Sequence, residues 1–570
     1  MSFLRLFHSW MPINTAIIGL LTINMLGISA CTSNNEASNL PPATEQVASN
    51  LASNNPASGD RLVTASIGDA SNLIPMIAGD SASHDVAGRL YLSLLKYDNN
   101  LQLTGALAKD WRISDDQLAI TFHLKPDLRW TDNMPLTSAD CVFTLELIQD
   151  NYTQSAFKSD YMLVDHSEAP DPYTFVVYYK EPFSPALSSW AGLAILPKHI
   201  FKGVDIMNTT LSRQPQATSG PYTLERWDSQ QNILLKANPH YHDGTVWISE
   251  RLTRIIPDTA TQFLELSAGR LDSMNLTPIQ YTRLFEGNAK LKKDYQRYHY
   301  LDFGYTYLGF NLKRKLFSDL RVRKAIALAI DRSEIIDGVL MGQGEPIASP
   351  YKPGTYWQNT ALSPRAFNPS SASQLLDQAG WKDRDGDGWR DKDGQILRFT
   401  VLTNNGNKQR ADTATIIKER LKSLGIDMQV RLIEWSAFIE NFINKRDFDA
   451  VILGWSLNPE PDQYAMWHSS QTGPREFNFL SYHNDTVDRV LDQARRTFDR
   501  KQRKVFYDQM QQALFDDVPL VFLYAPYALP VLHKRIHGIS QGAAGIAYDN
   551  EHWFVPAAMQ TYHVTSISQQ

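Results

Sequence analysis

Three residues that follow a short apolar segment could serve either catalysis or binding. Gly454, Ser456 and Asn458 lie in the sequence G-W-S-L-N, directly after the apolar run 448–453. A G-x-S-x-G sequence between a strand and a helix marks the nucleophile of many hydrolases. Here Asn458 replaces the second glycine, and Pro459 follows where that helix would begin. A nucleophilic serine is therefore not expected, although a cell-surface serine hydrolase that uses Ser456 stays as a competing hypothesis.

Two other groups of residues could bind a metal ion. Asp383, Asp385 and Asp387 resemble the start of a calcium-binding EF-hand loop, which needs a bidentate glutamate at its twelfth position. Gly394 stands there, so a solvated turn is the expected structure. The pair His240-x-His242 could share one face of a strand, as metal ligands do. We predict no metal or other cofactor, and keep the three aspartates as the alternative.

The segments around Ser456 have the order of a parallel α/β unit. Residues 397–403, 426–432 and 448–453 are apolar or alternate with a period of two, which predicts strands. Residues 411–424 and 435–445 carry apolar side chains at helical spacing. The resulting β-α-β-α-β order implies a parallel sheet with 448–453 as a central strand.

The strand ends of this unit are the expected binding site. In open α/β sheets, ligands bind beyond the carboxyl ends of the strands. The segment from Gly454 through Trp455 and Ser456 to Asn458 lies at one such end, and Asn404 and Asn405 lie at another. We predict that these residues face a common crevice.

The N-terminus has the pattern of an export signal. Arg5 precedes an apolar segment at 11–26, and small residues stand before Cys31. This arrangement resembles a bacterial lipobox, which predicts a signal peptide at 1–30 and lipid attachment at Cys31. A plain secretory signal and an uncleaved anchor helix are the alternatives. Residues 31–60 are rich in Asn, Ser, Ala and Pro and are expected to form a disordered tether.

The size and composition of the chain limit its class. A chain of 570 residues is too long for one core, so two or more lobes are expected. Its 2 cysteines exclude a disulfide framework and a four-cysteine zinc site. The formal net charge is −6, and basic runs are absent from the sequence, so we expect no nucleic-acid partner.

The first half of the chain gives further structural predictions. Residues 62–67 are strand-like, 85–96 have the spacing of a helix, and 79–83 between them are expected to form a loop. The alternation on both sides of Asp115 and Asp116 predicts a hairpin. Thr137 is the expected N-cap of the next helix.

Several of these segments together resemble the family 5 extracellular solute-binding proteins, which include the oligopeptide- and dipeptide-binding subunits of ABC importers. The resemblance extends over nearly the whole chain after the tether. It is carried by blocks that occur in the same order as in the family, namely W-x-x-S-D-D to P-L-T-S-A-D at 111–140, G-P-Y at 220–222, N-P-x-Y at 238–241, G-F-N at 309–311, D-L-R-V-R-K-A-I at 319–326 and G-W at 454–455.

The resemblance implies a fold and a domain organisation. The fold is α/β and two-lobed, a type II periplasmic-binding-protein-like fold with an extra subdomain at about 97–205. The first lobe would comprise 61–305 and 525–570, and the second lobe 306–524. Two crossings near Gly304 and Leu523 would act as hinges.

The resemblance also implies a function without catalytic residues. An extended peptide would lie between the lobes and bind main-chain groups of Gly454 and Ser456 in one lobe and of Asp80, Ser81 and Ala82 in the other. Trp455 could pack on the ligand or on the core. The partners would be a peptide and the ABC permease subunits of the inner membrane. The protein would be a monomer held in the periplasm by its N-terminal lipid.

One residue departs from the family pattern. Many peptide-binding members carry an aspartate that holds the ligand's α-ammonium at the position of Asn458, and a neutral amide loses that charge-assisted bond. Glu460 or Asp462 could replace it. A nickel complex, an oligosaccharide or a blocked peptide therefore stay open as ligands, and a chaperone or adhesin with an unused cleft is a further alternative.

Overall fold

The computed structural model describes residues 55–543, 545–562 and 564. These described residues belong to one compact unit. The predicted signal peptide, Cys31 and nearly all of the predicted tether lie outside the described residues, so these predictions are untested. Among the residues that the structure describes, no helix has the length and apolar character that a membrane span needs.

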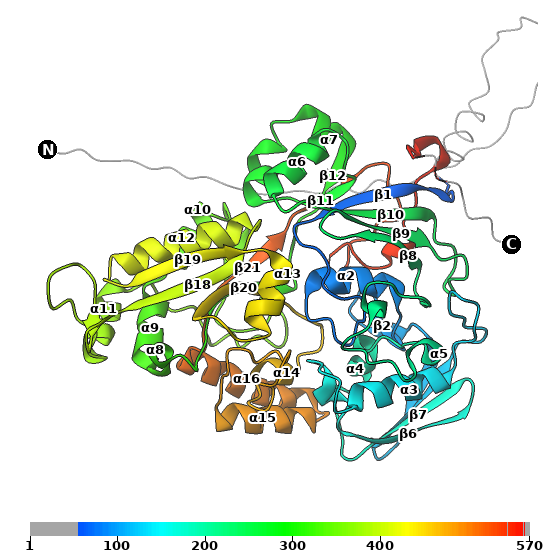
Figure 1. The fold of residues 1–570 in the computed structure, drawn as a ribbon, viewed down its shortest axis with the longest axis horizontal. Helices are drawn as coiled ribbons and strands as arrows, with labels where there is room; N and C mark the ends of the chain where they lie inside the picture. Colours follow the sequence, from blue (N-terminus) through cyan, green and yellow to red (C-terminus); the bar gives the residue numbers. More distant parts are fainter. Residues whose placement is uncertain (1–54, 544, 563, 565–570) are drawn as a thin grey trace, which may run out of the picture. The chain divides into compact units, whose positions relative to one another are not determined.

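The first large sheet combines the beginning, middle and end of the chain (Figure 1). Strands β1 and β10 pair in parallel at its centre, and β10, β9 and β8 follow as an antiparallel run. The order is β12 (Tyr295–Arg297), β22 (Pro530–His533), β11 (Ser273–Asn275), β1 (Gly59–Ser66), β10 (Ile248–Ile255), β9 (Asn232–Ala237) and β8 (Tyr222–Asp228).

The second large sheet contains the predicted β-α-β-α-β unit. Strand β18 pairs in parallel with both β19 and β20, which confirms that prediction. Helix α12 (Lys408–Lys422) connects β18 to β19, and α13 (Trp435–Ala437) with the π-helix η4 (Phe438–Ile443) connects β19 to β20. The order is β13 (Tyr300–Leu301), β21 (Leu520–Ala528), β14 (Gly304–Phe310), β20 (Ala450–Ser456), β18 (Arg398–Asn404) and β19 (Asp427–Ile433), with β15 (Gly344–Pro346) also on β21.

The chain passes between the two sheets twice. Strand β12 belongs to the first sheet and β13 to the second, while β21 belongs to the second and β22 to the first. The sheet pairings thus put the crossings at 298–299 and at Leu529, rather than near Gly304 and Leu523. Strand β21 extends further than expected because it pairs with β15 and β13 as well as β14.

A smaller antiparallel sheet lies within the segment that we expected to be an extra subdomain. Its order is β4 (Ala108–Ile113), β5 (Ala119–Leu124), β7 (Thr174–Tyr179) and β6 (Val164–Asp171). The pairing of β4 with β5 confirms the hairpin around Asp115. Helix α3 (Ser138–Gln149) starts with a capping box formed by Thr137 and Asp140, which confirms the predicted N-cap.

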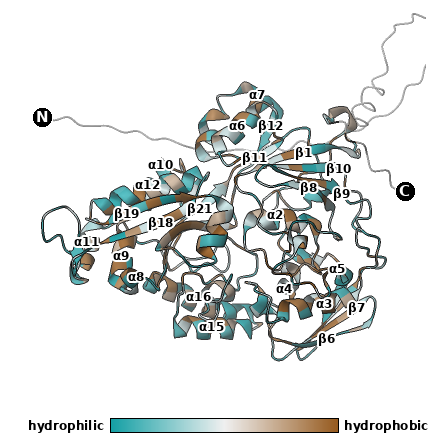
Figure 2. Cartoon of the chain, viewed as in Figure 1, coloured by the Kyte–Doolittle hydropathy of each residue, from teal (hydrophilic) through white to brown (hydrophobic). Residues whose placement is uncertain are grey.

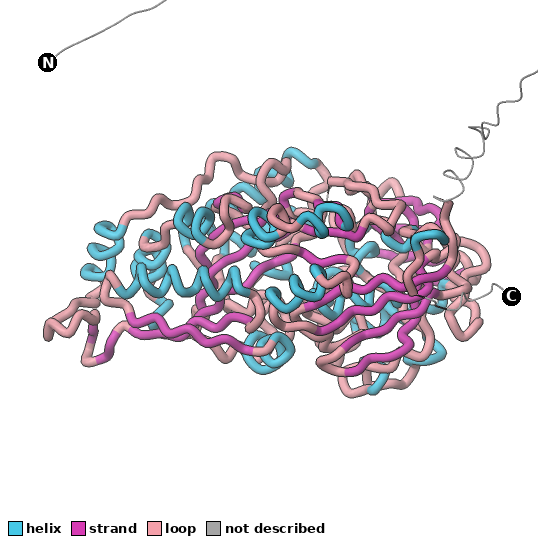
Figure 3. The backbone as a smooth tube through the Cα atoms, turned by 90° about the horizontal axis from the view of Figure 1, so that it is seen from above, coloured by secondary structure: helices cyan, strands magenta, loops and turns pink. Residues whose placement is uncertain are grey.

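The remaining described elements are helices, short turns and two small hairpins. Figure 3 shows the helices alongside the strands of the sheets. They are β2 (Leu95–Tyr97), β3 (Leu103–Gly105), η1 (Lys158–Asp160), α4 (Ala186–Gly192), α5 (Lys198–Phe201), η2 (Thr210–Ser212), α6 (Thr259–Ser267), η3 (Gln280–Leu284), α7 (Ala289–Asp294), α8 (Lys315–Ser318), α9 (Leu320–Leu328), α10 (Arg332–Gly338), α11 (Pro369–Gln378), β16 (Asp391–Lys392), β17 (Gln395–Ile396), α14 (Tyr464–Trp467), α15 (Asp485–Arg495), α16 (Arg500–Asp517), η5 (Asn550–His552) and η6 (Ala557–Met559).

Apolar side chains cover both faces of the second sheet. Leu308, Val401 and Ile452 pack with α9, α10, α11 and α12 on one face. Tyr307 and Val451 pack with η4, α15 and α16 on the other. Figure 2 shows the hydrophobic colouring of the strands and the hydrophilic outer faces of the helices.

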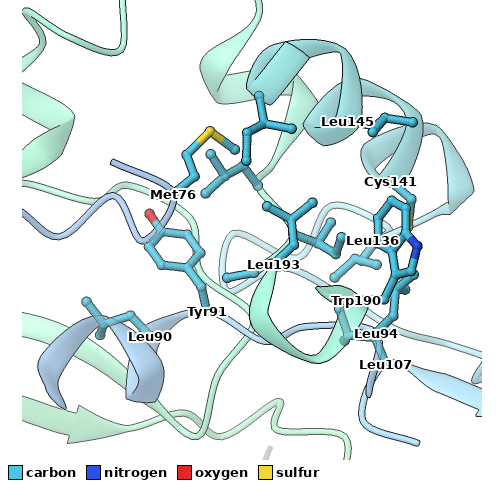
Figure 4. Packing of buried hydrophobic residues seen from close by; sticks show 14 of the residues in the cluster. Met76, Leu90, Tyr91, Leu94, Leu107, Leu136, Cys141, Leu145, Trp190 and Leu193 are labelled. Carbon is cyan, nitrogen blue, oxygen red and sulfur yellow. The ribbon is translucent and has the colours of Figure 1, made fainter. Parts of the chain in front are cut away.

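The small sheet and α3 share a core with the first large sheet. This core is large and includes fully buried aromatic side chains, and Figure 4 shows how Cys141 of α3 lies beside Trp190 of α4 within it. Burial raises the pKa of the Cys141 thiol far above its usual range, as expected for a cysteine that acts as a small apolar side chain.

One helix begins earlier than predicted. The helix expected at 85–96 is α2 (Ser81–Leu90), and Leu95 belongs to a strand. Residues 81–83, expected in a loop, form the first turn of α2 because the side chain of Asp80 accepts a hydrogen bond from the main-chain N–H of Ser83. Such N-capping supplies a partner for a helix N–H group that otherwise has none.

Candidate functional site

One edge of strand β20 lacks a strand partner at its carboxyl end. On one side, β20 pairs with β14 along its whole length, from Ala450 to Ser456. On the other side, its pairing with β18 ends at Val451. We call the β18-facing edge of residues 454–456 the open edge. An extended ligand can add there as a further strand.

Hydrogen-bond alternation shows which groups the open edge presents. In an antiparallel pair, directly opposite residues alternate between hydrogen-bonded and non-hydrogen-bonded pairs. The N–H of Leu457 donates to the carbonyl of Phe303, 2.8 Å away. By this alternation, Trp455 also bonds to β14, whereas the N–H and C=O groups of Gly454 and Ser456 point to the open edge. These are the two main-chain positions that the sequence resemblance implied.

Arg410 lies next to the open edge and was not found from the sequence. The side chain of Asn407 caps α12 and accepts from the N–H of Arg410, which fixes Arg410 in the first turn. Its Nη1 donates to Asn404 Oδ1 at 2.8 Å. A Cβ on Gly454 would be 2.7 Å from Arg410 Nη2, so the glycine makes room for the guanidinium.

The charge of Arg410 is not balanced by a neighbouring acid. Within the described part of the chain, no carboxylate lies within 4 Å of this guanidinium. Burial lowers the pKa of Arg410 from its usual value, and the nearby Tyr524 and Tyr307 oppose that shift. The site therefore contains one half-buried positive charge that a polar or anionic ligand atom could stabilise.

The other predicted residues of this lobe differ in exposure. Asn404 is buried and Asn405 is exposed; the N–H of Asn405 donates to the carbonyl of Ile433. Ser456 and Asn458 are both exposed. Trp455 packs against Phe477 and Phe479, with ring centroids 5.2 and 5.7 Å away, so much of its indole joins the core of this lobe.

Asp80 links the two lobes through its side chain. Besides capping α2, it accepts from Ser71 Oγ at 2.6 Å and from Trp435 Nε1 of the second lobe at 3.3 Å. Trp435 also lies against Gly68, where a Cβ would be 2.7 Å from the indole. The carboxylate of Asp80 thus both caps helix α2 and contacts the second lobe. Ser81 and Ala82 lie in the first turn of α2, where main-chain N–H groups have no helical partner.

Glu460 and Asp462 are both engaged by arginines. Glu460 pairs with Arg503 and accepts from Ser188 Oγ of the first lobe at 3.1 Å. Asp462 pairs with Arg495 at 2.6 Å, and Arg495 also pairs with Asp160 of the first lobe at 2.5 Å. Each carboxylate has an arginine within ion-pair distance, so part of its negative charge is already balanced within the protein.

The alternative chemistry found in the sequence does not meet at the open edge. No described histidine or acid hydrogen-bonds to Ser456, and the next helix, α14, starts only at Tyr464. Asp383, Asp385 and Asp387 do cluster, with all their ligand atoms within 4.8 Å. Their exposed loop lies before β16, and the N–H of Leu397 next to the amino end of β18 donates to the carbonyl of Arg390 just after the loop. Asn404 is at the carboxyl end of β18. His242 hydrogen-bonds to the carbonyl of Ala106.

The fold and the open edge define a class. The chain has two lobes built on mixed sheets, two crossings that join them, and a strand edge available between them. This is the architecture of the type II periplasmic binding proteins. The chain belongs to the bacterial extracellular solute-binding proteins of family 5, whose sequence model ("family 5 Middle") matches residues 102–476.

Individual relatives agree with this family. The oligopeptide-binding protein AppA of Bacillus subtilis is 32% identical over 511 residues, which cover 88% of this chain and 92% of AppA. The structure of AppA in complex with a nonapeptide has a TM-score of 0.84 and covers 88% of this chain and 100% of that one. The structure of NikZ from Campylobacter jejuni in complex with Ni(L-His) has a TM-score of 0.78 at 23% identity and covers 87% and 99% of the two chains.

Proposed function

We propose that this protein is the substrate-binding subunit of an ABC importer and that it captures peptides between its lobes. The observation that carries the proposal is the open edge of β20. The N–H and C=O groups of Gly454 and Ser456 point to that edge, where a peptide main chain can pair with them. Main-chain pairing gives affinity with little dependence on ligand sequence, which suits a receptor for many peptides.

The relatives support the same ligand class. AppA, with which this chain shares 32% identity, is described as oligopeptide-binding, and its structure contains a nonapeptide. The nickel complex of NikZ comes from a protein that shares the fold at lower identity. Among the described residues, the single group suited to a metal is the exposed acidic loop, which lies far along β18 from the open edge.

The proposal includes a location and a mode of action. The protein would act outside the cytoplasm as a monomer without enzymatic activity, anchored by a lipid on Cys31. Ligand contacts available only between closed lobes would stabilise the closed state, and the closed state would deliver the peptide to permease subunits.

Titration calorimetry with a random nonapeptide library tests the ligand class. The full-length protein should bind the library saturably, and a library with N-methylated amides should bind at least tenfold more weakly because it cannot donate main-chain hydrogen bonds to the open edge. Equal affinity for both libraries would contradict main-chain recognition. Complete failure to bind either library would contradict peptide capture.

A further inference from the structure

Gly454 leaves one face of the open edge to Arg410. Strand side chains alternate between the two faces of a sheet. Ile452 packs in the core on the α12 face, whereas Leu453 and Trp455 belong to the core on the other face. A Cβ on Gly454 would therefore point to the α12 face, and it would meet Arg410 Nη2 at 2.7 Å. The guanidinium thus lies over the face that the glycine leaves empty.

A ligand strand at the open edge would place one of its side chains on that same face. In paired strands, directly opposite residues have their side chains on one face, with Cβ atoms about 4.5–5.5 Å apart. The ligand residue opposite Gly454 therefore projects its side chain to the α12 face, and its two neighbours in the ligand project to the other face. We call this ligand residue the Gly454 position. Because glycine has no side chain, residue 454 does not separate the ligand side chain from Arg410.

Arg410 is held in place and keeps hydrogen-bond donors for a ligand. Its main-chain N–H donates to the cap residue Asn407 at 3.0 Å, and its Nη1 donates to Asn404 Oδ1 at 2.8 Å. Among the described residues, Asn404 is the one hydrogen-bond partner of the guanidinium. A guanidinium carries five N–H donors in a planar fork that fits a carboxylate. Nη2, the guanidinium nitrogen nearest Gly454, is thus left for a ligand atom.

We propose that Arg410 makes the Gly454 position selective for an acidic side chain, so that the protein prefers peptides with Asp or Glu at that one residue. This inference rests on the proposed function. An acidic side chain there brings a carboxylate to the free donors of Arg410 and balances its charge. A basic side chain would meet a like charge, and an apolar one would leave the guanidinium without a partner. Main-chain pairing supplies the general affinity, and this contact adds one side-chain preference.

A position scan with peptide libraries tests the inference on the wild-type, full-length protein. Titration calorimetry compares pairs of nonapeptide libraries, one pair for each position, in which that position is fixed as Glu or as Gln. The other positions are random and uncharged, and all peptides end in an amide. At one position the Glu library should bind about tenfold more tightly, the difference expected between a charge-assisted and a neutral hydrogen bond. Equal affinities at every position would overturn the inference, while peptide binding would stand.

Substitutions in α12 assign the preference to one side chain. Arg410→Gln should abolish the preference by weakening the Glu library alone, and Arg410→Lys, which keeps the charge but loses the fork, should retain a smaller preference. Arg420→Gln is the matched control, because Arg420 lies near the other end of α12 and pairs with Glu334 at 2.7 Å. This control should retain the full preference. A preference that persists in Arg410→Gln would overturn the assignment.

Two other roles of Arg410 would give different results. If Arg410 served the fold alone, Arg410→Gln would weaken the Glu and Gln libraries equally, which would overturn the inference. If Arg410 bound the ligand's α-carboxylate, a free carboxyl terminus would raise the affinity of the Gln library for the wild type but not for Arg410→Gln, which would also overturn it. Failure of the wild type to bind any library would refute the proposed function and this inference with it.

Discussion

Gly454 shows how a single residue joins fold and site. Its main chain faces the open edge, and the absence of a side chain lets Arg410 Nη2 lie where a Cβ would be only 2.7 Å away. The carbonyl of Tyr305 would be 3.1 Å from the same Cβ and belongs to the paired strand, which cannot move freely. A side chain at this position would therefore displace Arg410 first.

Gly454→Ala should lower the free energy of unfolding by about 1–3 kcal/mol, the usual cost of overpacking, and weaken ligand binding because Arg410 moves. Urea denaturation and calorimetry measure the two effects. Gly88→Ala is the control, because Gly88 is exposed within α2 and nothing lies within 4 Å of its added Cβ. That change should stabilise the protein by about 0.5–1 kcal/mol. Unchanged stability and binding in Gly454→Ala would contradict the close contact.

His242 should make stability dependent on pH. Burial, and next the charge of Lys125, lower the pKa of His242 to about 4 from an ordinary value near 6.5. The unfolded chain binds this proton at a higher pH than the folded chain does. The neutral imidazole of His242 therefore contributes its full stabilisation of the fold above pH 6.5, and this stabilisation is lost as the pH falls toward 4. It amounts to about 2–3 kcal/mol.

His242→Gln should flatten the pH dependence of urea denaturation between pH 6.5 and 4. His240→Gln is the matched control, since His240 is exposed two residues away and should leave the dependence as it is in the wild type. Equal pH dependence in the wild type and His242→Gln would show that the buried imidazole is not the source.

The sequence located Gly454 and Ser456 but missed Arg410. The first two follow an apolar strand, and strand ends are where α/β proteins bind ligands. Arg410 lies in a helix whose pattern predicts only an amphipathic surface, and its contact with Gly454 depends on the packing of α12.

Helix α15 makes much of the contact between the lobes at its carboxyl end. Arg495 lies between Asp462 of its own lobe and Asp160 of the other, and its guanidinium is 3.8 Å from the centroid of the Tyr464 ring. Burial and the neighbouring Asp462 raise the pKa of Asp160, while Arg495 opposes this. The main chain also contributes, because the N–H of Ser184 donates to the carbonyl of Arg495 at 2.7 Å.

Arg495→Gln should lower the free energy of unfolding by about 3–5 kcal/mol, because it leaves two largely buried carboxylates without their cation. Arg496→Gln is the control one residue away. Arg496 is exposed and pairs with Glu181 at 2.9 Å, so its loss should cost at most about 1 kcal/mol. Denaturant unfolding measures both, and similar losses for the two variants would show that Arg495 does not hold the lobes together.

The β-α-β-α-β unit of the second lobe was predictable, whereas the start of α2 was not. The β-α-β-α-β order follows from apolar runs and helical spacing that repeat along one continuous segment. In α2, Ser81 and Ala82 carry no apolar signal, and the helix starts there because Asp80 caps it. The crossings between the sheets also lie at other residues than the sequence predicted, because the length of β21 depends on its pairing with β13 and β15 from other parts of the chain.

The molecule as a whole combines polar links between its lobes with a binding edge between them. These links include the contacts of Asp80 with Trp435, of Asp160 with Arg495 and of Ser188 with Glu460. Polar contacts of this kind can break and re-form as the lobes open and close. A ligand that binds both lobes would shift the equilibrium between the open and closed states toward closure. A receptor built in this way needs a ligand rather than a catalytic residue to act.

The most direct test of peptide capture is mass spectrometry of the ligand that the full-length protein carries when it is purified natively and then denatured. The account predicts a mixture of peptides of varied sequence and similar length. Release of a nickel complex or an oligosaccharide instead of peptides would contradict the proposed ligand class, although the fold and the family would stand.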